Sequence, residues 1–260
     1  MTSNTAQILT IIPARMGSHR LPGKPLADMA GLPMIVRVWQ QAVKADLGPV
    51  IVACAEDEIK TVIEAAGGEA ILTDPQLPSG SDRVWAAAQV YDPAGAFDII
   101  LNLQGDMPLI DPDILRATVQ VLRAQARADI ATAVTGLKSE AERRSPHIVK
   151  AILAPDSRAL NFSRKSAGAQ EKPPQERDLF HHVGLYAYRR AALSQFCSLP
   201  PSARELDERL EQLRALDNDM IIYAAHIDHA PAGIDTKEDF AQANAVLKAE
   251  KAKNFDEKPQ

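Results

Sequence analysis

The sequence predicts an α/β protein with a mixed central sheet, and two features of the chain carry this prediction. From residue 6 to residue 126, short apolar segments alternate with amphipathic ones, as expected of parallel strands joined by helices. After about residue 135, apolar segments follow one another without long helices, which predicts an antiparallel extension. The chain has 260 residues and is 46% hydrophobic, which is ample for a core.

The expected elements are placed by apolar periodicity, caps and turn residues. Pro13 should end the first strand, Pro33 should lie in the first turn of a helix, and Gly67-Gly68 should close the next helix. Asp235 or Thr236 should cap the last helix. Strands are expected at residues 6–12, 49–53, 70–73, 98–103, 130–135, 148–153, 159–163, 183–188 and 220–225, and helices at 34–45, 57–66, 82–90, 111–126, 205–216 and 236–247.

Composition excludes several classes of protein. A net charge of −5 argues against a general nucleic-acid binder. Cys54 and Cys197 lie far apart and outside any C-x-x-C pattern, so we expect reduced thiols. No apolar run approaches the roughly 20 residues that cross a bilayer, and residues 1–7 lack a signal-peptide pattern, which favours a soluble, cytoplasmic protein. Segments 165–178 and 248–260 are polar and are expected to pack poorly.

The segment from residue 11 to residue 26, I-I-P-A-R-M-G-S-H-R-L-P-G-K-P-L, predicts a polyphosphate-binding loop. An apolar strand leads directly into it, and Gly17 and Gly23 allow backbone N–H groups to turn toward a ligand. Positive charge comes from Arg15, Arg20 and Lys24. The alternative is an ordinary strand-to-helix loop with surface cations, since the segment contains no Walker A sequence.

Two further stretches combine polar groups with the ends of expected elements. Residues 78–83, P-S-G-S-D-R, offer hydroxyls at a helix N-terminus that suit a base or ribose, although Ser81 or Asp82 could simply cap the helix. Asp106 follows an expected buried strand, where a hard cation could join it to phosphate oxygens. A turn aspartate is the alternative there.

The loop at residues 11–26 resembles the signature of nucleotidyltransferases that activate acidic sugars, and its L-P-G-K-P-L ending is most similar to the 3-deoxy-manno-octulosonate cytidylyltransferases. The resemblance spans about residues 8–243. It implies a Rossmann-like nucleotidyltransferase fold with an antiparallel sugar-binding and dimerisation extension. It also implies one domain over 1–247, with a nucleotide half at about 1–135, a sugar-binding and dimerisation part at about 136–225, and a polar tail at 248–260.

Three motifs extend the resemblance on the nucleotide side. Residues 79–83 resemble S-G-T-D-R with Ser81 for threonine, and 104–108 resemble Q-G-D-E-P with Met107 for glutamate. Residues 233–236 resemble G-V-D-T. The resemblance implies that Asp106 and Asp235 bind Mg²⁺. The nucleotide-binding set that it implies is Ala14, Arg15, Ser18, Arg20, Lys24, Ser79, Gly80, Ser81, Arg83 and Gln104.

The sugar side is carried by three other motifs. Residues 162–164, 182–186 and 210–214 resemble F-S-R, H-x-G-x-Y and L-E-Q-L-R. The implied sugar-binding set is Gln104, Arg164, His182, Tyr186, Glu211 and Gln212, in which arginine suits a carboxylate and the others suit hydroxyls. The sequence departs from the family at residues 165–168, at His181 and at Cys54-Ala55.

The resemblance implies a magnesium-dependent reaction in which the anomeric hydroxyl of 3-deoxy-D-manno-octulosonate (Kdo) attacks the α-phosphate of CTP. Arg15 would stabilise the α-phosphate, Lys24 the leaving pyrophosphate, and Asp106 and Asp235 the metal. CMP-Kdo for lipopolysaccharide biosynthesis would be made by a homodimer. The alternatives are an amino-substituted Kdo or another acidic sugar as acceptor, and a nucleotide-binding regulatory protein without turnover.

Overall fold

The computed structural model describes residues 6–17, 21–165 and 178–256, and side chains as far as residue 249. The chain forms two compact units that are each discontinuous in sequence. The first consists of Met1–Leu9, Asp92–Asn102 and Asp113–Ala230, and the second of Thr10–Tyr91, Leu103–Pro112 and Pro231–Gln260. The single domain expected over 1–247 stays a prediction. Ser18, Arg20 and nearly all of the expected poorly packed segment 165–178 lie outside the described residues.

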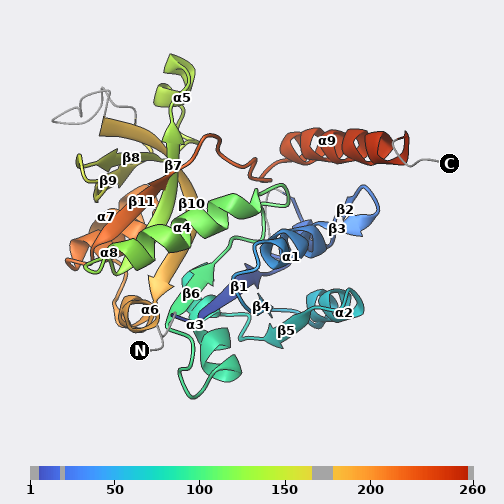
Figure 1. Cartoon of the computed structure of the whole chain (residues 1–260), viewed down its shortest axis with the longest axis horizontal. Helices are drawn as coiled ribbons and strands as arrows, with labels where there is room; N and C mark the ends of the chain where they lie inside the picture. Colours follow the sequence, from blue (N-terminus) through green and yellow to red (C-terminus); the bar gives the residue numbers. More distant parts are fainter. Residues whose placement is uncertain (1–5, 18–20, 166–177, 257–260) are drawn as a thin grey trace. The chain divides into compact units, whose positions relative to one another are not determined.

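The second unit is built on parallel strands joined by helices (Figure 1). Its strands run in the order β1-β4-β5, and the central residues of β1 and β4 are completely buried, as expected of a parallel sheet, whereas β5 is partly exposed. Helices α1 and α2 contact each other and β4. The alternation predicted from the sequence is therefore confirmed here. The bounds are β1 (Ile8–Ala14), α1 (Met34–Lys44), β4 (Val50–Cys54), α2 (Asp57–Ala65), β5 (Glu69–Leu72) and α3 (Gly80–Tyr91).

Several element boundaries in this unit differ from the predictions. Pro13 does not end β1 but lies inside it, opposite Ala53, because its fixed φ suits an extended strand near its end. Pro33 is the N-cap of α1 and not part of its first turn. Two features between the loop and α1 were not predicted. They are a 3-10 helix, η1 (Lys24–Leu26), and the short hairpin of β2 (Asp28–Met29) and β3 (Leu32–Pro33).

The C-terminal segment of the second unit is helical for longer than expected. Helix α9 (Lys237–Asp256) continues through most of the predicted polar tail. Its residues Phe240 and Ala243 pack in an apolar cluster with Met29 and Ile234, which attaches the segment before α9 to this unit. In the part of the chain that the structure describes, no helix is both long and apolar enough to span a membrane.

The first unit contains a mixed sheet with strand order β11-β7-β10-β6 (Figure 1). Strand β10 is antiparallel to β6 and β7, β11 is parallel to β7, and β8 joins β10 to β9 in antiparallel pairing. The predicted mixed sheet with an antiparallel extension is therefore confirmed. The bounds are β6 (Ile99–Asn102), α4 (Pro112–Ala124), β7 (Ile130–Gly136), α5 (Glu140–Arg144), β8 (Lys150–Leu153), β9 (Ala159–Ser163), β10 (Leu179–Arg189), α6 (Arg190–Ser198) and β11 (Ile222–His226).

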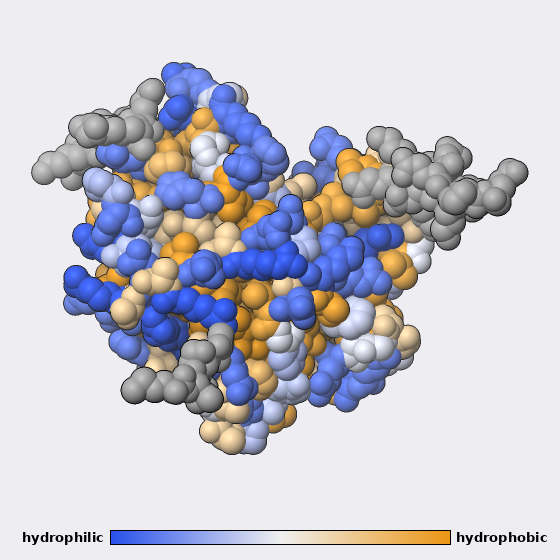
Figure 2. All heavy atoms as spheres, viewed as in Figure 1, coloured by the Kyte–Doolittle hydropathy of each residue, from blue (hydrophilic) through white to orange (hydrophobic). Residues whose placement is uncertain are grey.

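Helices α5 and α6 were not predicted. The sequence of α5, E-A-E-R-R, has no buried residue, and Figure 2 shows hydrophilic side chains over its tip. Its N-cap Ser139 accepts a hydrogen bond from the backbone N–H of Glu142, so local capping and charge pairs hold this short helix without a core-facing stripe. Cys54 is buried and Cys197 is partly exposed.

The helix expected at 205–216 is wrong: two short helices, α7 (Ala203–Glu208) and α8 (Gln212–Asp217), are separated by Arg209 in the left-handed conformation at φ 55°. The reason is the ion pair of Glu205 with Arg214. In one continuous helix, residues 205 and 214 are nine positions apart and would lie about 13.5 Å from each other along the axis. In the structure, Arg214 Nε and Nη2 donate to the two Glu205 carboxylate oxygens at 2.8 and 2.6 Å. The chain must therefore bend between them.

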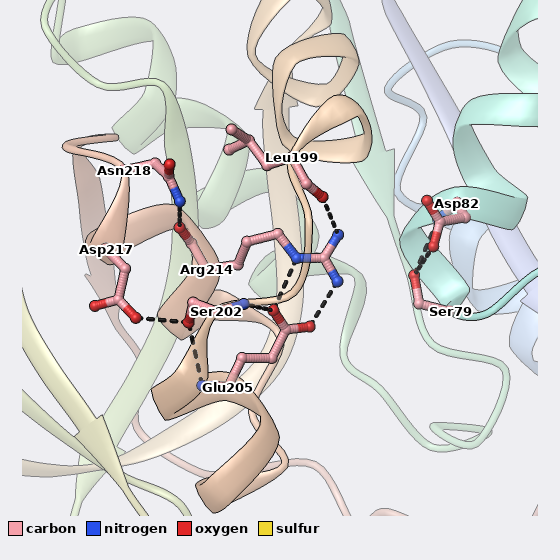
Figure 3. A network of polar contacts seen from close by, with 8 residues as sticks. All are labelled: Ser79, Asp82, Leu199, Ser202, Glu205, Arg214, Asp217 and Asn218. Atoms are coloured by element: carbon pink, nitrogen blue, oxygen red, sulfur yellow. Dashed lines mark hydrogen bonds and ion pairs between the residues drawn. The ribbon is translucent and has the colours of Figure 1, made fainter.

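This ion pair is buried and belongs to a wider polar network (Figure 3). The side chains of Arg214 and Glu205 are 6% and 9% exposed, and the guanidinium lies 4.6 Å from the ring centre of Phe196. Ser202 and Glu205 form a capping box at the start of α7. The Ser202 hydroxyl also donates to Asp217 at 2.6 Å. The arginine of the L-E-Q-L-R motif is therefore structural.

We expect Arg214→Ala to lower the free energy of unfolding by about 3–5 kcal/mol, because it leaves the Glu205 carboxylate buried without its partner. Urea unfolding at neutral pH measures the loss. Arg204→Ala is the matched control, since Arg204 pairs with Asp217 at the surface and should cost less than about 1 kcal/mol. Equal losses in the two variants would contradict the structural role of Arg214.

Candidate active site

The second unit contains a pocket of about 310 Å³ at the end of β1. Six of the predicted nucleotide-binding residues and the predicted metal ligand Asp106 line it. Ala14 and Ser81 do not line it: both are buried, Ser81 completely. The lining consists of Pro13, Arg15, Gly17, Lys24, Pro25, Met34, Leu77, Ser79, Gly80, Arg83, Gln104, Gly105 and Asp106.

The loop that carries Gln104 and Asp106 packs directly on the end of β1. A Cβ atom at Gly105 would lie 2.8 Å from the main-chain oxygen of Pro13, which is closer than real contacts allow. Only glycine permits this approach. Gly105 was not predicted to have a role, although a glycine between two functional residues is a typical sign of close packing.

Lys24 brings the two predicted metal ligands together. Gly23 adopts φ 69°, which suits glycine, and η1 then begins at Lys24, whose side chain is only 11% exposed. The Lys24 Nζ atom donates to Asp106 Oδ2 at 3.1 Å and to Asp235 Oδ1 at 3.3 Å. Residues from three distant parts of the sequence therefore form one cluster of charges in this unit.

A set of main-chain hydrogen bonds holds Asp235 in this cluster. The N–H of Ile234 donates to the main-chain oxygen of Asp106 at 2.9 Å. Asp239 accepts from the N–H groups of Asp235 and Thr236 at 3.0 and 2.8 Å, and its own N–H donates to the Thr236 hydroxyl. Thr236 is therefore the helix cap, and the Asp235 side chain pairs with Lys24. Asp239 was missed, although the D-T-x-x-D spacing is typical of such reciprocal capping.

Ser79 is the cap at the start of α3. Neither Ser81 nor Asp82, which were the candidates from the sequence, caps this helix. The Ser79 hydroxyl accepts from the Asp82 N–H at 3.1 Å and donates to the Asp82 carboxylate at 2.7 Å (Figure 3). The helix begins at Gly80, earlier than predicted, so Ser79 occupies the N-cap position and Ser81 turns into the interior.

Arg83 is a buried cation at the edge of the pocket. Its Nη1 donates to the Thr73 hydroxyl at 2.5 Å and to the main-chain oxygen of Asp74 at 3.1 Å. Its Nη2 is buried and has no partner among the described residues. Burial lowers the pKa of Arg83 below its ordinary value. A guanidinium in this state would be stabilised by an acceptor or anion from a ligand.

Met107, which stands where the family commonly has glutamate, is 8% exposed. Its side chain belongs to the apolar interior and supplies no ligand. Over the described residues, no cluster of three or more His, Cys, Asp or Glu side chains is arranged to hold a metal ion. The two predicted metal ligands, Asp106 and Asp235, do face one point, the Lys24 ammonium.

The predicted sugar-binding residues other than Gln104 gather in the first unit. Arg164 follows the end of β9, His182 and Tyr186 lie on β10, and Glu211 and Gln212 begin α8, which packs against β9. Strand β10 carries two extra residues between Val183 and Tyr186, opposite adjacent residues of β7. Because side chains alternate between the two faces of a strand, an insertion of two residues leaves His182 and Tyr186 on the same face of the sheet. Their ring centres lie 5.7 Å apart.

His182 is held in one orientation. Its Nε2 lies 2.9 Å from the Thr132 hydroxyl, and that hydroxyl donates to the Leu185 carbonyl at 2.8 Å. We therefore assign the proton to Nε2, which leaves Nδ1 as an acceptor. The ring meets Phe162 edge-on, and burial lowers the pKa of His182 to about 3. The imidazole is neutral at physiological pH and suits a hydroxyl.

Tyr186 and Gln212 add two buried polar groups to this cluster. Burial raises the pKa of Tyr186, and the negative charge of Glu211 raises it further, so the phenol stays protonated. Gln212 is 5% exposed, and its Nε2 has no hydrogen-bond partner among the described residues. A buried amide left in this way is typical of a site that binds a polar ligand.

The cytidylyltransferase family model matches residues 9–224 of this chain. The chain belongs to the cytidylyltransferase family. A relative named 3-deoxy-manno-octulosonate cytidylyltransferase from Rhodospirillum rubrum is 49% identical, covering 92% of this chain and 95% of its own. Another with the same name, from Paramagnetospirillum magneticum, is 51% identical, covering 93% and 98%.

Solved structures give the same family. A CMP:2-keto-3-deoxy-manno-octonic acid synthetase complexed with CTP is similar with a TM-score of 0.85 and 34% identity, over 94% of this chain and all of that one. A 4-diphosphocytidyl-2C-methyl-D-erythritol synthase from Anaerococcus prevotii, with a TM-score of 0.61 and 14% identity, shares the fold. The predicted family, the mixed α/β nucleotidyltransferase fold and the enzymatic class are confirmed.

The state of His182 predicts a pH dependence of stability. Because the folded pKa of about 3 lies below the unfolded value near 6.5, the unfolded chain binds more protons, and stability is lost as pH falls from 6.5 toward 3. His182 contributes up to one proton, or about 1.4 kcal/mol per pH unit. We expect His182→Gln, whose amide can reach Thr132, to flatten the plot of unfolding free energy against pH. Parallel plots for the variant and the wild type would contradict this assignment.

Proposed function

We propose that this family member transfers CMP from CTP to Kdo and releases pyrophosphate. The observation that carries the proposal is the charge cluster in the pocket of the second unit, where Lys24 joins Asp106 and Asp235 beside Arg15 and Arg83. Such a group of cations and carboxylates suits a triphosphate with its metal. The names of the relatives from Rhodospirillum rubrum and Paramagnetospirillum magneticum support Kdo as the acceptor.

On the nucleotide side, the chain supplies charge and position. Arg15 is exposed at the mouth of the pocket and would neutralise the α-phosphate. Lys24 would pair with the β- and γ-phosphates, exchanging its carboxylate partners for phosphate oxygens. Arg83 has a buried Nη2 free for an acceptor of the nucleotide. No protein nucleophile is required, because positioning and charge neutralisation carry this kind of transfer.

Magnesium belongs to the same proposal, and the residues present fit it. Asp106 and Asp235 offer carboxylate oxygens to the same point, which are the ligands that Mg²⁺ prefers, and phosphates and water would complete the octahedron. When bound, the ion would neutralise phosphate charge and lower the pKa of the attacking hydroxyl. Because Lys24 occupies this position between the carboxylates, nucleotide binding would draw the ammonium away and favour the cation.

On the sugar side, Arg164 would bind the carboxylate of Kdo through a bidentate pair. The Nδ1 of His182 would accept from a hydroxyl, and the Gln212 amide would donate to one. Tyr186 and Glu211 would complete the contacts. We assign no side chain as general base. A homodimer and a role in lipopolysaccharide biosynthesis, both implied by the resemblance of the motifs, are further parts of the proposal, as is the cytoplasmic location expected from the sequence.

A pyrophosphate-release assay tests the proposal. It crosses CTP, UTP, ATP and GTP with Kdo, 8-amino-Kdo and sialic acid, and we expect the largest kcat/KM for CTP with Kdo. A larger value with 8-amino-Kdo or sialic acid would move the acceptor to that sugar. Tight CTP binding without turnover for any acceptor would contradict the enzyme and support a regulatory nucleotide-binding protein.

We expect Asp235→Asn to retain most of the stability of the fold and to lose at least tenfold in turnover, because one anionic ligand of the proposed metal site is removed. The Mg²⁺ concentration that gives half-maximal rate should rise. Glu238→Gln, an exposed change of equal charge in the first turn of α9, should leave both values unchanged. Wild-type rates for Asp235→Asn at limiting Mg²⁺ would remove Asp235 from the site.

A further inference from the structure

The main chain of Arg164 is held by two charged side chains. Strand β9 ends at Ser163, so no strand pairing fixes the peptide groups of the next residue. Instead, the Arg164 N–H donates to Glu208 Oε2 at 2.9 Å, and its carbonyl accepts from Lys150 Nζ at 3.2 Å. Both main-chain polar groups of this arginine thus depend on side chains from other elements.

Glu208 is in an unusual place for a carboxylate. It is the last residue of α7, where the helix carbonyls disfavour negative charge. Its side chain is only 12% exposed, and its Oε1 accepts from the Ser163 hydroxyl at 3.1 Å. The helix itself therefore gives no reason for this carboxylate. The contacts with residues 163 and 164 explain this carboxylate, because both of its oxygens accept hydrogen bonds there.

Lys150 is a second costly group at the same point. Its side chain is completely buried in β8, opposite Ser163, and its Nζ also donates to the Ser145 carbonyl. Burial lowers its pKa, the positive charge of Arg164 lowers it further, and the negative charge of Glu208 raises it. A buried ammonium is expensive unless it is well partnered, and an apolar side chain would fill the space more cheaply. The carbonyl of Arg164 is one of its partners.

We propose that Glu208 and Lys150 are positioning residues for the sugar-binding step, which fix the main chain of Arg164 so that its guanidinium meets the carboxylate of an acidic sugar. This inference rests on the proposed function. Bidentate pairing of arginine with carboxylate demands orientation as well as charge. Because the arginine side chain is long, a small rotation of its main chain moves the guanidinium by ångströms, and such displacements cost large factors in rate.

The test is Glu208→Leu, which keeps most of the side-chain volume and removes the acceptor of both donors, the Arg164 N–H and the Ser163 hydroxyl. Steady-state kinetics are measured with Kdo and CTP varied separately. We expect the KM for Kdo to rise tenfold or more and the KM for CTP to stay within twofold. A Kdo KM equal to wild type, or a parallel rise for CTP, would overturn the proposal.

Asp207→Asn is the matched control. Asp207 is the neighbouring carboxylate on α7 and binds the same Lys165 ammonium, at 3.2 Å, as Glu208 does at 3.4 Å, but it contacts that side chain and not the main chain of residues 163–164. The Asp207 side chain is exposed. Removal of its charge should leave both KM values within twofold of wild type. An equal effect of the two variants would assign the defect to Lys165 or to surface charge.

A double-variant comparison separates positioning from general stability. In an Arg164→Ala background the guanidinium is absent, so Glu208→Leu should change kcat/KM for Kdo by less than twofold. A merely structural role would lower it by the same factor as in the wild type, which would overturn the proposal. Lys150→Met should resemble Glu208→Leu if it folds, and the Glu208 result decides the matter if it does not.

Amide hydrogen exchange without substrates makes the test independent of the reaction. We expect the Arg164 amide to exchange at least tenfold faster in Glu208→Leu than in the wild type or Asp207→Asn, because its acceptor is removed. Unchanged exchange would overturn the anchoring whatever the substrate is. Faster exchange with a wild type that releases no pyrophosphate from any acidic sugar would instead overturn the proposed function and leave the anchoring established.

Discussion

The pocket of the second unit depends on one ammonium between two carboxylates. Asp106 and Asp235 could not lie so close without a cation, since like charges at this distance repel, and Lys24 Nζ lies 3.1 and 3.3 Å from them. The hydrogen bond from Ile234 N–H to the Asp106 carbonyl sets the distance between their two segments. The apolar cluster under α9 holds the later segment in place. Packing, main-chain geometry and charge thus agree at one point.

The first unit uses buried charge differently, to fix the main chain. The pair of Arg214 with Glu205 bends the chain at Arg209, and the bend allows α8 to start with Glu211 and Gln212 beside β9. Arg190 and Asp92 form another well-buried pair, at 2.7 Å. Such pairs add little net stability, because desolvation offsets most of their attraction. These pairs instead restrict the conformation of the main chain, because few other conformations would give every buried charge a partner.

Much of this fold could be predicted from the sequence because apolar periodicity reports directly on burial. The strand at 159–163 was predicted with its observed bounds, and the alternation in the second unit was confirmed. The predictions failed where a long-range contact decides local structure. The break at Arg209 follows from an ion pair, and no propensity signals it. Pro13 was read as a strand end, although a proline is tolerated where its missing N–H removes little pairing.

The candidate site was predicted as separate motifs, and the sequence could not supply the contacts among them. Lys24, Asp106 and Asp235 were each named, but nothing in the sequence says that the lysine lies between the carboxylates. Glu208 lies two residues before the L-E-Q-L-R motif at 210–214, from which Glu211 and Gln212 were assigned to the sugar. Its role was missed because its partners at Arg164 include a main-chain N–H, which every residue but proline carries.

Two buried atoms argue for ligands independently of any resemblance. Arg83 Nη2 in the second unit and Gln212 Nε2 in the first have no partner among the described residues, and each such group costs about 1–3 kcal/mol. Stable proteins keep few groups of this kind, and each of them needs an explanation, of which a ligand from outside is one. Each belongs to the set that the motifs had assigned to a substrate, Arg83 to the nucleotide and Gln212 to the sugar. A polar substrate group at either atom would recover the free energy lost there, so the proposed function gives both side chains a part in specificity as well as affinity.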